Sequence, residues 1–152
     1  YKDGSLCNNL YHEIAQKIDD LCESINVSLL ITQEPRGVSG HLDHVALSMI
    51  STFVYEKRLS IGAVWYYCIT KEVRSSISNY FIHFPDGYDR KNIDLVVDIS
   101  EVMDQKIAAI KCHASQIKDV ERILNRMPNF PKEECFLIST RSDRKVSIDD
   151  YL

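Results

Sequence analysis

The sequence predicts an α/β fold with a mostly parallel sheet. Segments whose apolar residues recur at helical spacing alternate with short, nearly unbroken apolar runs. Such runs are typical of strands that a parallel sheet buries on both faces. The chain has 152 residues, of which 45% are hydrophobic and 26% charged, and this is the size and composition of one globular domain.

The first third of the chain predicts a helix, a strand and a second helix. Apolar residues at helical spacing over residues 5–25 indicate a helix with one buried face. Residues 27–32 (VSLLIT) follow as a buried strand, and residues 33–40, which contain a proline and two glycines, follow as a loop. The second helix is expected over residues 43–57.

The middle of the chain predicts two more strands. Residues 63–69 (AVWYYCI) are rich in aromatic and branched side chains, which favour a strand. Residues 71–88 show no clear period, and we expect them to be mostly irregular. Residues 94–99 (DLVVDI) predict a strand, and their flanking aspartates indicate an edge or an extended arm.

The C-terminal third is predicted to hold two helices and a short strand. Ser100 is expected to cap a helix over residues 101–112. A further helix over residues 116–127 ends before Pro128. Residues 136–138 (FLI) are expected to form a last strand.

The order of these elements indicates an incomplete domain. A doubly wound sheet usually opens with a central strand, whereas this chain opens with a helix and begins without methionine. We therefore expect one or more N-terminal strands to be missing. Residues 1–140 would be the C-terminal part of a single domain, and residues 141–152 a loose polar tail.

Charge and cysteine usage limit the expected partners. The net charge is −4 and no basic block stands out, which argues against a nucleic-acid or anionic-membrane surface. The five cysteines are widely spaced without a CxxC pair, a pattern typical of thiols in a reducing compartment. No apolar run reaches the roughly 20 residues of a membrane span, and no signal peptide is visible. We expect a cytoplasmic protein.

Residues 37–44 (GVSGHLDH) carry the strongest chemical signal, because they place two imidazoles and a carboxylate within four residues. They lie between a predicted strand and a predicted helix, where α/β sheets bind ligands. The first turn of the helix would put His41 and His44 on one face, and a helix N-terminus keeps imidazole neutral and able to bind metal. Asp43 is placed to hold a neighbouring histidine. By spacing alone, capping and surface roles remain open.

The other histidines carry weaker signals. His113 lies at the end of a predicted helix, where interaction with the helix dipole is the simpler interpretation. His12 is expected to be solvated, and His83 is expected to pack among aromatic neighbours. Nucleophilic catalysis finds no support, because Ser39 lacks a nucleophile-elbow context.

Four stretches together resemble the N-acetylglucosaminyl deacetylases of the PIG-L/LmbE type. They are KDGSL at residues 2–6, VSLLIT leading to GVSGHLDHVALS, VDIS at residues 97–100, and KIAAI followed by CHASQ at residues 106–116. The resemblance implies a Rossmann-like, three-layer α/β sandwich. It also implies an enzyme that uses zinc to hydrolyse the N-acetyl group of an amino sugar.

The resemblance also implies roles for individual residues. His44 would be a zinc ligand, His41 would stabilise the oxyanion or protonate the leaving amine, and Asp43 would orient a catalytic histidine. Asp3 would lie near the sugar and hydrogen bond to one of its hydroxyls. His113 and Gln116 match an HxSQ motif, and a role as pocket wall or structural support is expected for them.

One part of the family pattern is absent. No His-Pro-Asp-Asp motif occurs in the chain, and in the family this motif supplies two further zinc ligands and the general base. We therefore expect the chain alone to bind zinc weakly and to be inactive, and its partners to be the missing N-terminal segment and an N-acetylated amino-sugar substrate. Related enzymes often form homo-oligomers, so a homo-oligomer is a further expectation.

Two alternative functions remain open. The first is a non-catalytic remnant that binds a sugar or a protein partner. The second is another metallo-hydrolase that uses His41 and His44, for example on phosphate esters. The second is disfavoured, because the sequence offers no evident arginine pair or P-loop to hold a phosphate.

Overall fold

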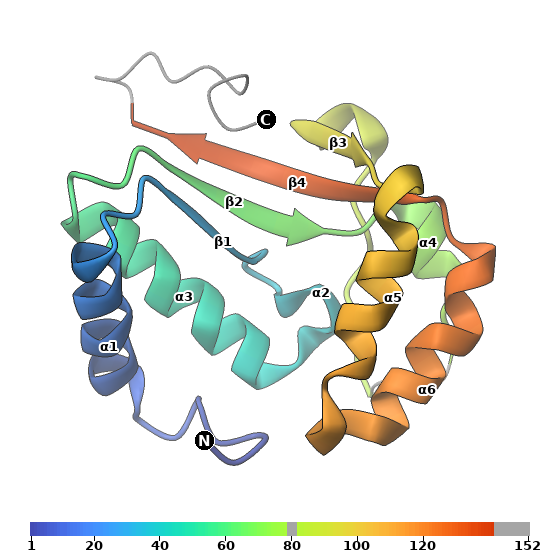
Figure 1. Ribbon diagram of the computed structural model, residues 1–152, viewed down its shortest axis with the longest axis horizontal. Coiled ribbons are helices and arrows are strands. Elements are labelled where there is room, and N and C mark those ends of the chain that lie inside the picture. Colours follow the sequence, from blue (N-terminus) through green and yellow to red (C-terminus); the bar gives the residue numbers. More distant parts are fainter. Residues whose placement is uncertain (79–81, 142–152) are drawn as a thin grey trace. The chain divides into compact units, whose positions relative to one another are not determined.

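The computed structural model describes residues 1–78 and 82–141, which form an α/β structure with one four-stranded sheet (Figure 1). The strands follow the order β1-β2-β4-β3 across the sheet. Their bounds are Leu29–Gln33 for β1, Ala63–Cys68 for β2, Leu95–Asp98 for β3 and Glu133–Thr140 for β4. The α/β prediction is confirmed, and the open sheet is compatible with a Rossmann-like fold.

The sheet is mixed, so the prediction of a mostly parallel sheet is wrong. Strand β2 pairs in parallel with β1, with Leu29 opposite Ala63, and antiparallel with β4, with Cys68 opposite Cys135. A short apolar run such as FLI indicates that a strand is buried. It does not indicate whether the strand runs parallel or antiparallel to its neighbours. The direction of β4 is set by the connection that precedes it, which has no signature within the strand itself.

The described residues form two compact units. The first comprises Tyr1–Leu95 and the segment from Cys135 onward, and the second comprises Val96–Glu134. In the first unit, helices α1 (Tyr11–Ser24) and α3 (Leu42–Lys57) lie side by side, and α3 packs against β1 and β2 (Figure 1). The core of this unit consists of the buried residues Ile14, Ala15, Cys22, Ile50, Val54, Tyr55, Ile61 and Val64.

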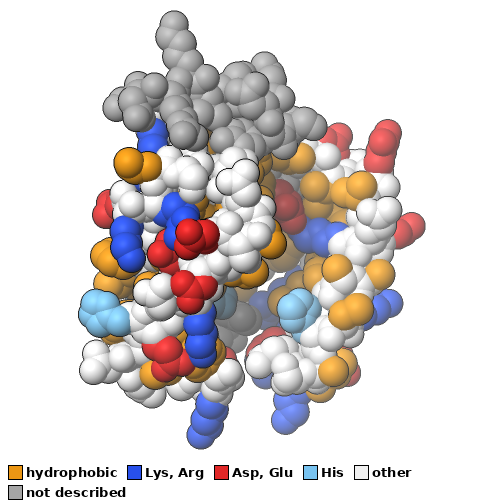
Figure 2. All heavy atoms as spheres, turned by 60° about the vertical axis from the view of Figure 1, so that its left-hand side comes forward, with side chains coloured by type: hydrophobic (Ala, Val, Ile, Leu, Met, Phe, Trp, Pro, Cys, Tyr) orange, Lys and Arg blue, Asp and Glu red, His pale blue; other side chains and the backbone are white. Residues whose placement is uncertain are grey.

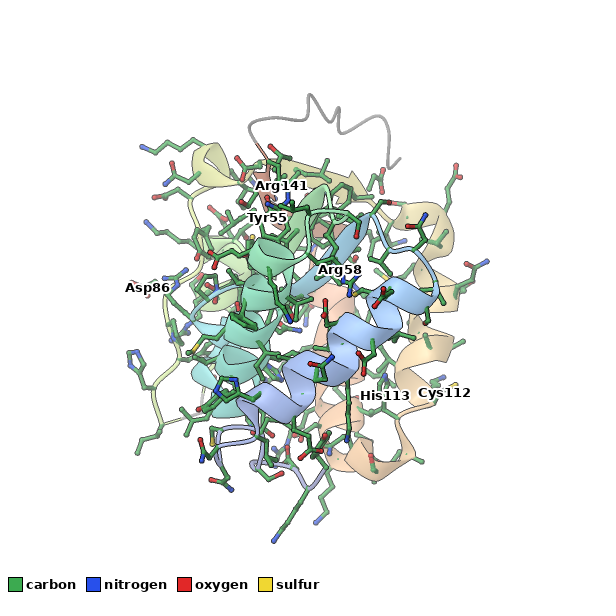
Figure 3. The ribbon with its side chains drawn as sticks, turned by 90° about the vertical axis from the view of Figure 1, so that its left-hand side faces the viewer. Tyr55, Arg58, Asp86, Cys112, His113 and Arg141 are labelled. Carbon is green, nitrogen blue, oxygen red and sulfur yellow. The ribbon has the colours of Figure 1, made fainter. Side chains whose placement is uncertain are left out.

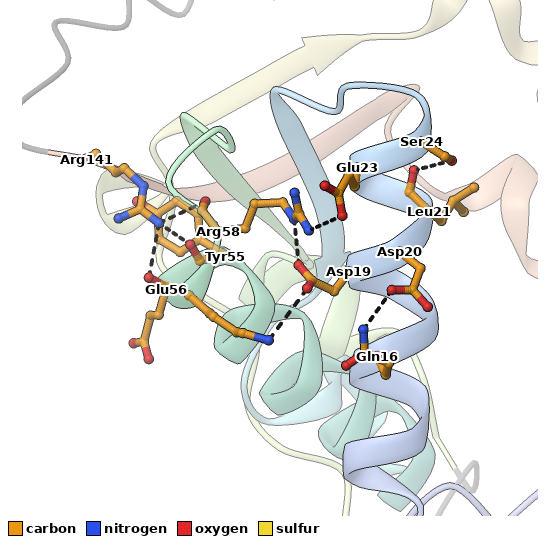
Figure 4. Close-up of polar contacts among 11 residues, drawn as sticks. Gln16, Asp19, Asp20, Leu21, Glu23, Ser24, Tyr55, Glu56, Arg58 and Arg141 are labelled. Carbon is orange, nitrogen blue, oxygen red and sulfur yellow. Dashed lines mark hydrogen bonds and ion pairs between the residues drawn. The ribbon is translucent and has the colours of Figure 1, made fainter.

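An ion-pair network joins the C-terminal parts of α1 and α3 (Figure 4). The Arg58 guanidinium donates from Nε to the buried Asp19 carboxylate at 2.6 Å and from Nη2 to Glu23 at 3.2 Å. The ammonium of Lys57 lies 3.6 Å from the same Asp19 carboxylate. These contacts fix the crossing of the two helices at their C-terminal ends.

Arg141 completes the end of α3 from the far end of the chain (Figures 3 and 4). It donates to the carbonyl of Ile61 at 3.0 Å, and its Nη2 donates to the carbonyls of Tyr55, Glu56 and Arg58. These groups include carbonyls that the end of a helix leaves without intrahelical donors. The predicted loose tail over residues 141–152 therefore begins with a bound residue, and the remainder of that prediction lies outside the described residues.

Several predicted segments of the first unit have different bounds in the structure. The strands expected over residues 27–32 and 136–138 are β1 (Leu29–Gln33) and β4 (Glu133–Thr140). The first helix begins at Tyr11 and not at Ser5, because the chain turns before it, with Asn9 at φ 65°. The segment after β2 was expected to be mostly irregular, yet it contains α4 (Lys71–Ser75), capped by the Thr70 hydroxyl. Residues 79–81 of that segment lie outside the described residues.

The second unit contains the two predicted helices, α5 (Met103–Lys111) and α6 (Ile117–Arg126). The prediction that Ser100 caps the first of them is wrong. Ser100 instead donates its backbone N–H to the Asp98 carboxylate at 2.8 Å and opens a separate 3-10 turn, Ser100–Val102. The local turn formed with the aspartate two residues earlier places Ser100 at the start of this 3-10 turn and not at the start of α5.

Three further features concern the described part of the chain. None of the five cysteines, all of which lie within it, forms a disulfide. Among the described helices, none combines the length and the apolar character needed to span a bilayer. On the face shown in Figure 2, acidic and basic side chains are interspersed without a continuous basic patch.

Candidate functional site

The loop between β1 and α3 carries the GVSGHLDH motif and has an unusual backbone. Its single helical turn, α2 (Gly37–Gly40), contains Val38 at φ 59° and ψ −59°. These angles resemble the central residue of a classic γ-turn, which is rare and strained for a β-branched side chain. Gly40 has φ 79°, and a Cβ there would lie 2.8 Å from the His83 carbonyl oxygen. The loop therefore requires glycine at position 40, and it holds Val38, two positions earlier, in a strained conformation.

His41 stands at the N-terminus of α3 and serves as its cap. Its Nδ1 accepts the backbone N–H of Asp43 at 3.2 Å. In the neutral imidazole the proton must then be on Nε2. This Nε2 lies 3.8 Å from Oδ1 of Asp3, whose side chain is exposed. His41 therefore presents an N–H donor toward the N-terminal segment.

Asp43 is buried at the first turn of α3 and binds that N-terminal segment. Its Oδ2 accepts the N–H of Gly4 at 2.7 Å, and its Oδ1 accepts the N–H of Leu6 at 2.9 Å. The Asp43 carboxylate therefore binds backbone N–H groups of the N-terminal segment, whereas the backbone N–H of Asp43 orients His41. The role expected for Asp43, orientation of a catalytic histidine, stays a prediction for its side chain.

His44 lies one turn into the same helix and is held by the loop. Its Nδ1 is 3.1 Å from the carbonyl oxygen of Gly37, so Nδ1 must carry a proton and donate it. The lone pair of the neutral ring is then on Nε2. Burial lowers the pKa of the His44 imidazole, although the hydrogen bond to Gly37 raises it. A neutral imidazole with a free Nε2 lone pair and an oriented Nδ1–H is the usual form of a histidine metal ligand.

The structure brings four of the predicted site residues together. Asp3, His41, Asp43 and His44 all lie at the N-terminus of α3, and the two imidazole rings have centroids 5.1 Å apart. His113 and Gln116 belong to the second unit. His113 is exposed in the turn between α5 and α6 (Figure 3), and its carbonyl accepts the N–H of Gln116 at 3.0 Å.

The sequence interpretation missed Glu34, which directly follows β1. This glutamate is 1% exposed, and its carboxylate accepts hydrogen bonds from the loop and from the Tyr88 hydroxyl. A glutamate at the end of a strand is usually solvated. The sequence feature that could have drawn attention to Glu34 is its position between the apolar run of β1 and the glycine-containing loop.

The chemistry available to this cluster is that of one metal ligand and one proton donor. Within residues 1–78 and 82–141, no group of three or more His, Cys, Asp or Glu side chains is placed to hold a metal ion. His44 offers a nitrogen lone pair, and His41 offers an N–H beside it. These groups are suited to a hydrolytic site whose other ligands come from elsewhere.

Comparison with known proteins places two deacetylases among the similar sequences. No protein-family model matches the chain. The chain is 26% identical over 120 residues to a 1D-myo-inositol 2-acetamido-2-deoxy-alpha-D-glucopyranoside deacetylase of Mycobacterium sp. (strain KMS), and 25% identical over 118 residues to the enzyme of the same name from strain JLS. Each alignment covers 69% of this chain and 38% of the relative. The similarity supports the deacetylase family loosely.

Proposed function

We propose that this chain forms part of the active site of a zinc-dependent deacetylase. The reaction would remove the N-acetyl group from a small molecule or glycoconjugate that contains N-acetylglucosamine. The observation that carries the proposal is the pair of backbone contacts that the two histidines make. The Gly37 carbonyl on Nδ1 of His44 requires its lone pair to be on Nε2, and the Asp43 N–H on Nδ1 of His41 requires its proton to be on Nε2. The distant similarity to two deacetylases of an acetamido sugar supports the choice of reaction.

His44 fits the requirements of a zinc ligand. Zinc is commonly bound by neutral imidazole nitrogen, and a backbone carbonyl on the other ring nitrogen fixes the ring and raises its basicity. The Gly37 carbonyl supplies that contact. The remaining ligands would come from outside the described residues, and a His-Pro-Asp-Asp segment of the parent protein is the source we propose. The chemistry that zinc would supply there is a bound water with its pKa lowered to about 7, which is a nucleophile at neutral pH.

His41 would act on the amide itself. Amide hydrolysis places negative charge on the carbonyl oxygen and requires a proton for the leaving amine. An Nε2–H that is held in place by the Asp43 backbone can donate to that oxygen without reorganisation. Protonation of the leaving amine would instead require the imidazolium form of His41, which becomes the neutral imidazole again when it gives up one proton.

Substrate recognition would involve residues around the histidines. The exposed Asp3 carboxylate, kept near His41 through Gly4 and Asp43, would accept a hydrogen bond from a sugar hydroxyl. For His113 and Gln116, which belong to the second unit, the expected role as pocket wall or structural support stays a prediction. A homo-oligomer and a cytoplasmic location complete the proposal.

A non-catalytic role is the alternative. It is favoured by one observation, that the described residues provide no group of three metal-ligating side chains. A chain of this kind would keep the histidine cluster as a site for a sugar or a protein partner. Activity that depends on His44 separates the two cases.

The test is acetate release from an N-acetylglucosaminyl inositol by the intact natural protein that contains this sequence, with and without added zinc. His44→Ala should abolish zinc-dependent release, whereas His12→Ala, which removes an exposed imidazole from α1, should leave it unchanged. Full activity of His44→Ala would overturn the proposed mechanism. Zinc-independent binding of the sugar without acetate release would support the alternative.

A further inference from the structure

The strained loop before α3 is wrapped around a single buried side chain, that of Glu34. Three consecutive backbone N–H groups donate to this residue. The N–H of Arg36 donates to Oε2 at 3.0 Å, that of Gly37 to the Glu34 carbonyl at 2.8 Å, and that of Val38 to Oε1 at 2.7 Å. Every donor of this stretch of the loop therefore points at Glu34, which is 1% exposed.

Two side chains close the other side of the carboxylate. The Tyr88 hydroxyl donates to Oε2 at 2.8 Å, and the Arg36 guanidinium lies 3.3 Å from the same oxygen and 4.2 Å above the Tyr88 ring. Burial and the Glu34 carboxylate raise the pKa of Tyr88 to about 12, so its hydroxyl stays protonated and donates throughout the neutral range. The carboxylate is thus supplied with donors on both oxygens, which a buried carboxylate requires.

The same loop holds His44. The Gly37 carbonyl accepts the Nδ1–H of His44 at 3.1 Å, and the residues on either side of Gly37 are bound to the Glu34 carboxylate. Val38 adopts its strained backbone angles at this point. Strained residues persist only where surrounding contacts determine their conformation, and here those contacts are made by Glu34.

We propose that Glu34 is a positioning residue for His44: its carboxylate fixes the strained Arg36–Val38 turn so that the Gly37 carbonyl selects the Nδ1–H tautomer of the His44 imidazole. The catalytic consequence rests on the proposed function, in which His44 needs its Nε2 lone pair aimed at a metal ion. The structural part does not depend on zinc. Loss of the Glu34 carboxylate frees the Gly37 carbonyl and allows His44 to populate both tautomers.

The test is the tautomer of His44, read by long-range ¹H–¹⁵N correlation NMR on the full chain without metal, at a pH where the imidazole is neutral. Glu34→Gln replaces one acceptor oxygen by an NH₂ group, which meets the donors of Arg36 and Tyr88 if it takes the place of Oε2, or the N–H of Val38 if it takes the place of Oε1. We expect His44 to change from the Nδ1–H tautomer to a mixture of both. An unchanged Nδ1–H tautomer in Glu34→Gln would overturn the proposal.

Three further variants make the result specific. Asp19→Asn also removes a buried carboxylate with an arginine partner, and it should leave the His44 tautomer unchanged. Adding Val38→Gly to Glu34→Gln should partly restore the tautomer, because glycine adopts the positive φ without the help of Glu34. If Glu34→Gln does not fold, the decision passes to Tyr88→Phe, which removes one donor and should give a smaller shift. A wild-type tautomer in Tyr88→Phe would then overturn the proposal.

Zinc affinity provides the second readout, in the intact natural protein. Loss of a partner that orients a metal-bound histidine typically weakens binding 10- to 100-fold, and we expect this range for Glu34→Gln. A wild-type protein without zinc would contradict the proposed function and leave the tautomer result standing. A wild-type protein with zinc and a Glu34→Gln variant of equal affinity would contradict the role of Glu34 alone.

Discussion

The buried carboxylate of Asp43 accepts the backbone N–H of Gly4 at 2.7 Å, across 39 positions of the sequence. It also accepts the N–H of Leu6, and Asp3 is thereby kept beside the imidazole of His41. The segment before α1 is therefore attached to the start of α3 through one side chain. This attachment, and not helix packing alone, places the first residues of the chain at the histidine cluster.

Asp43→Ala should release this segment. We expect faster amide hydrogen exchange at Gly4 and Leu6, and a loss of about 1–3 kcal/mol in the free energy of unfolding, because hydrogen bonds to a charged acceptor contribute on this scale. Asp20→Ala is the matched control, since its exposed carboxylate binds only the side chain of Gln16 among the described contacts. Wild-type exchange rates at Gly4 and Leu6 in Asp43→Ala would contradict the assignment.

The pairing of Asp19 with Arg58 predicts a pH dependence of stability. The Arg58 guanidinium lowers the pKa of the Asp19 carboxyl below its usual value of 3.8, so the unfolded chain takes up this proton at a higher pH than the folded chain. The stabilisation is fully present above the unfolded value and is lost as the pH falls through the lower folded value. Urea unfolding across this range should show the loss for the wild type.

Asp19→Asn should remove this part of the pH dependence. The variant should be less stable than the wild type at neutral pH by about 1–3 kcal/mol, and the difference should shrink as the pH falls below 3.8. Asp20→Asn should follow the wild-type curve. A constant difference between Asp19→Asn and the wild type at all pH values would show that the pairing does not shift the Asp19 pKa.

Two glycines with positive φ allow the energetic cost of backbone strain to be measured apart from the cost of a steric contact. Gly4 has φ 76° and open space where a methyl group would be added, whereas a Cβ on Gly40 would lie 2.8 Å from the His83 carbonyl oxygen. Gly4→Ala should cost about 1–2 kcal/mol, the usual penalty for the left-handed region. Gly40→Ala should cost more, because the loop that contains His83 must also move. If denaturant unfolding shows the same loss of free energy of unfolding for both variants, the close contact at Gly40 does not add to the cost of the substitution.

His41 is predicted to act in the chemical step without binding the metal. In the intact protein, His41→Ala should keep zinc and slow acetate release roughly 100-fold or more, the usual scale for losing one oxyanion donor. His41→Gln keeps an N–H donor but cannot transfer a proton. Partial rescue by His41→Gln would assign His41 to the oxyanion, and equal loss in both variants would assign it to the leaving amine. A full rate in His41→Ala would exclude it from the mechanism.

Features with a local cause were predictable from the sequence. The helix over residues 43–57 and the strand over residues 63–69 were found within a residue or two, because their apolar spacing depends on their own residues. The start of α1 was misplaced, since nothing in the spacing reveals that Asn9 turns the chain at φ 65°. The direction of β4 was also missed, because it follows from a connection and not from the strand.

The candidate site was predictable in part for the same reason. His41, Asp43 and His44 are adjacent in sequence, so their proximity in the structure was expected from helical geometry. The burial of Glu34 depends on Tyr88, 54 positions away, and no local pattern reports such a contact. The binding of Gly4 by Asp43 was hidden for the same reason.

The most direct test of the proposed metal site is the zinc content of the intact natural protein after purification and dialysis, compared with its His44→Ala, His41→Ala and His12→Ala variants. We expect one bound zinc in the wild type, in His41→Ala and in His12→Ala, and loss of most of it in His44→Ala, because of the two clustered histidines only His44 is held with its Nε2 lone pair available to a metal. Stoichiometric zinc in His44→Ala would contradict the assignment of His44 as a ligand.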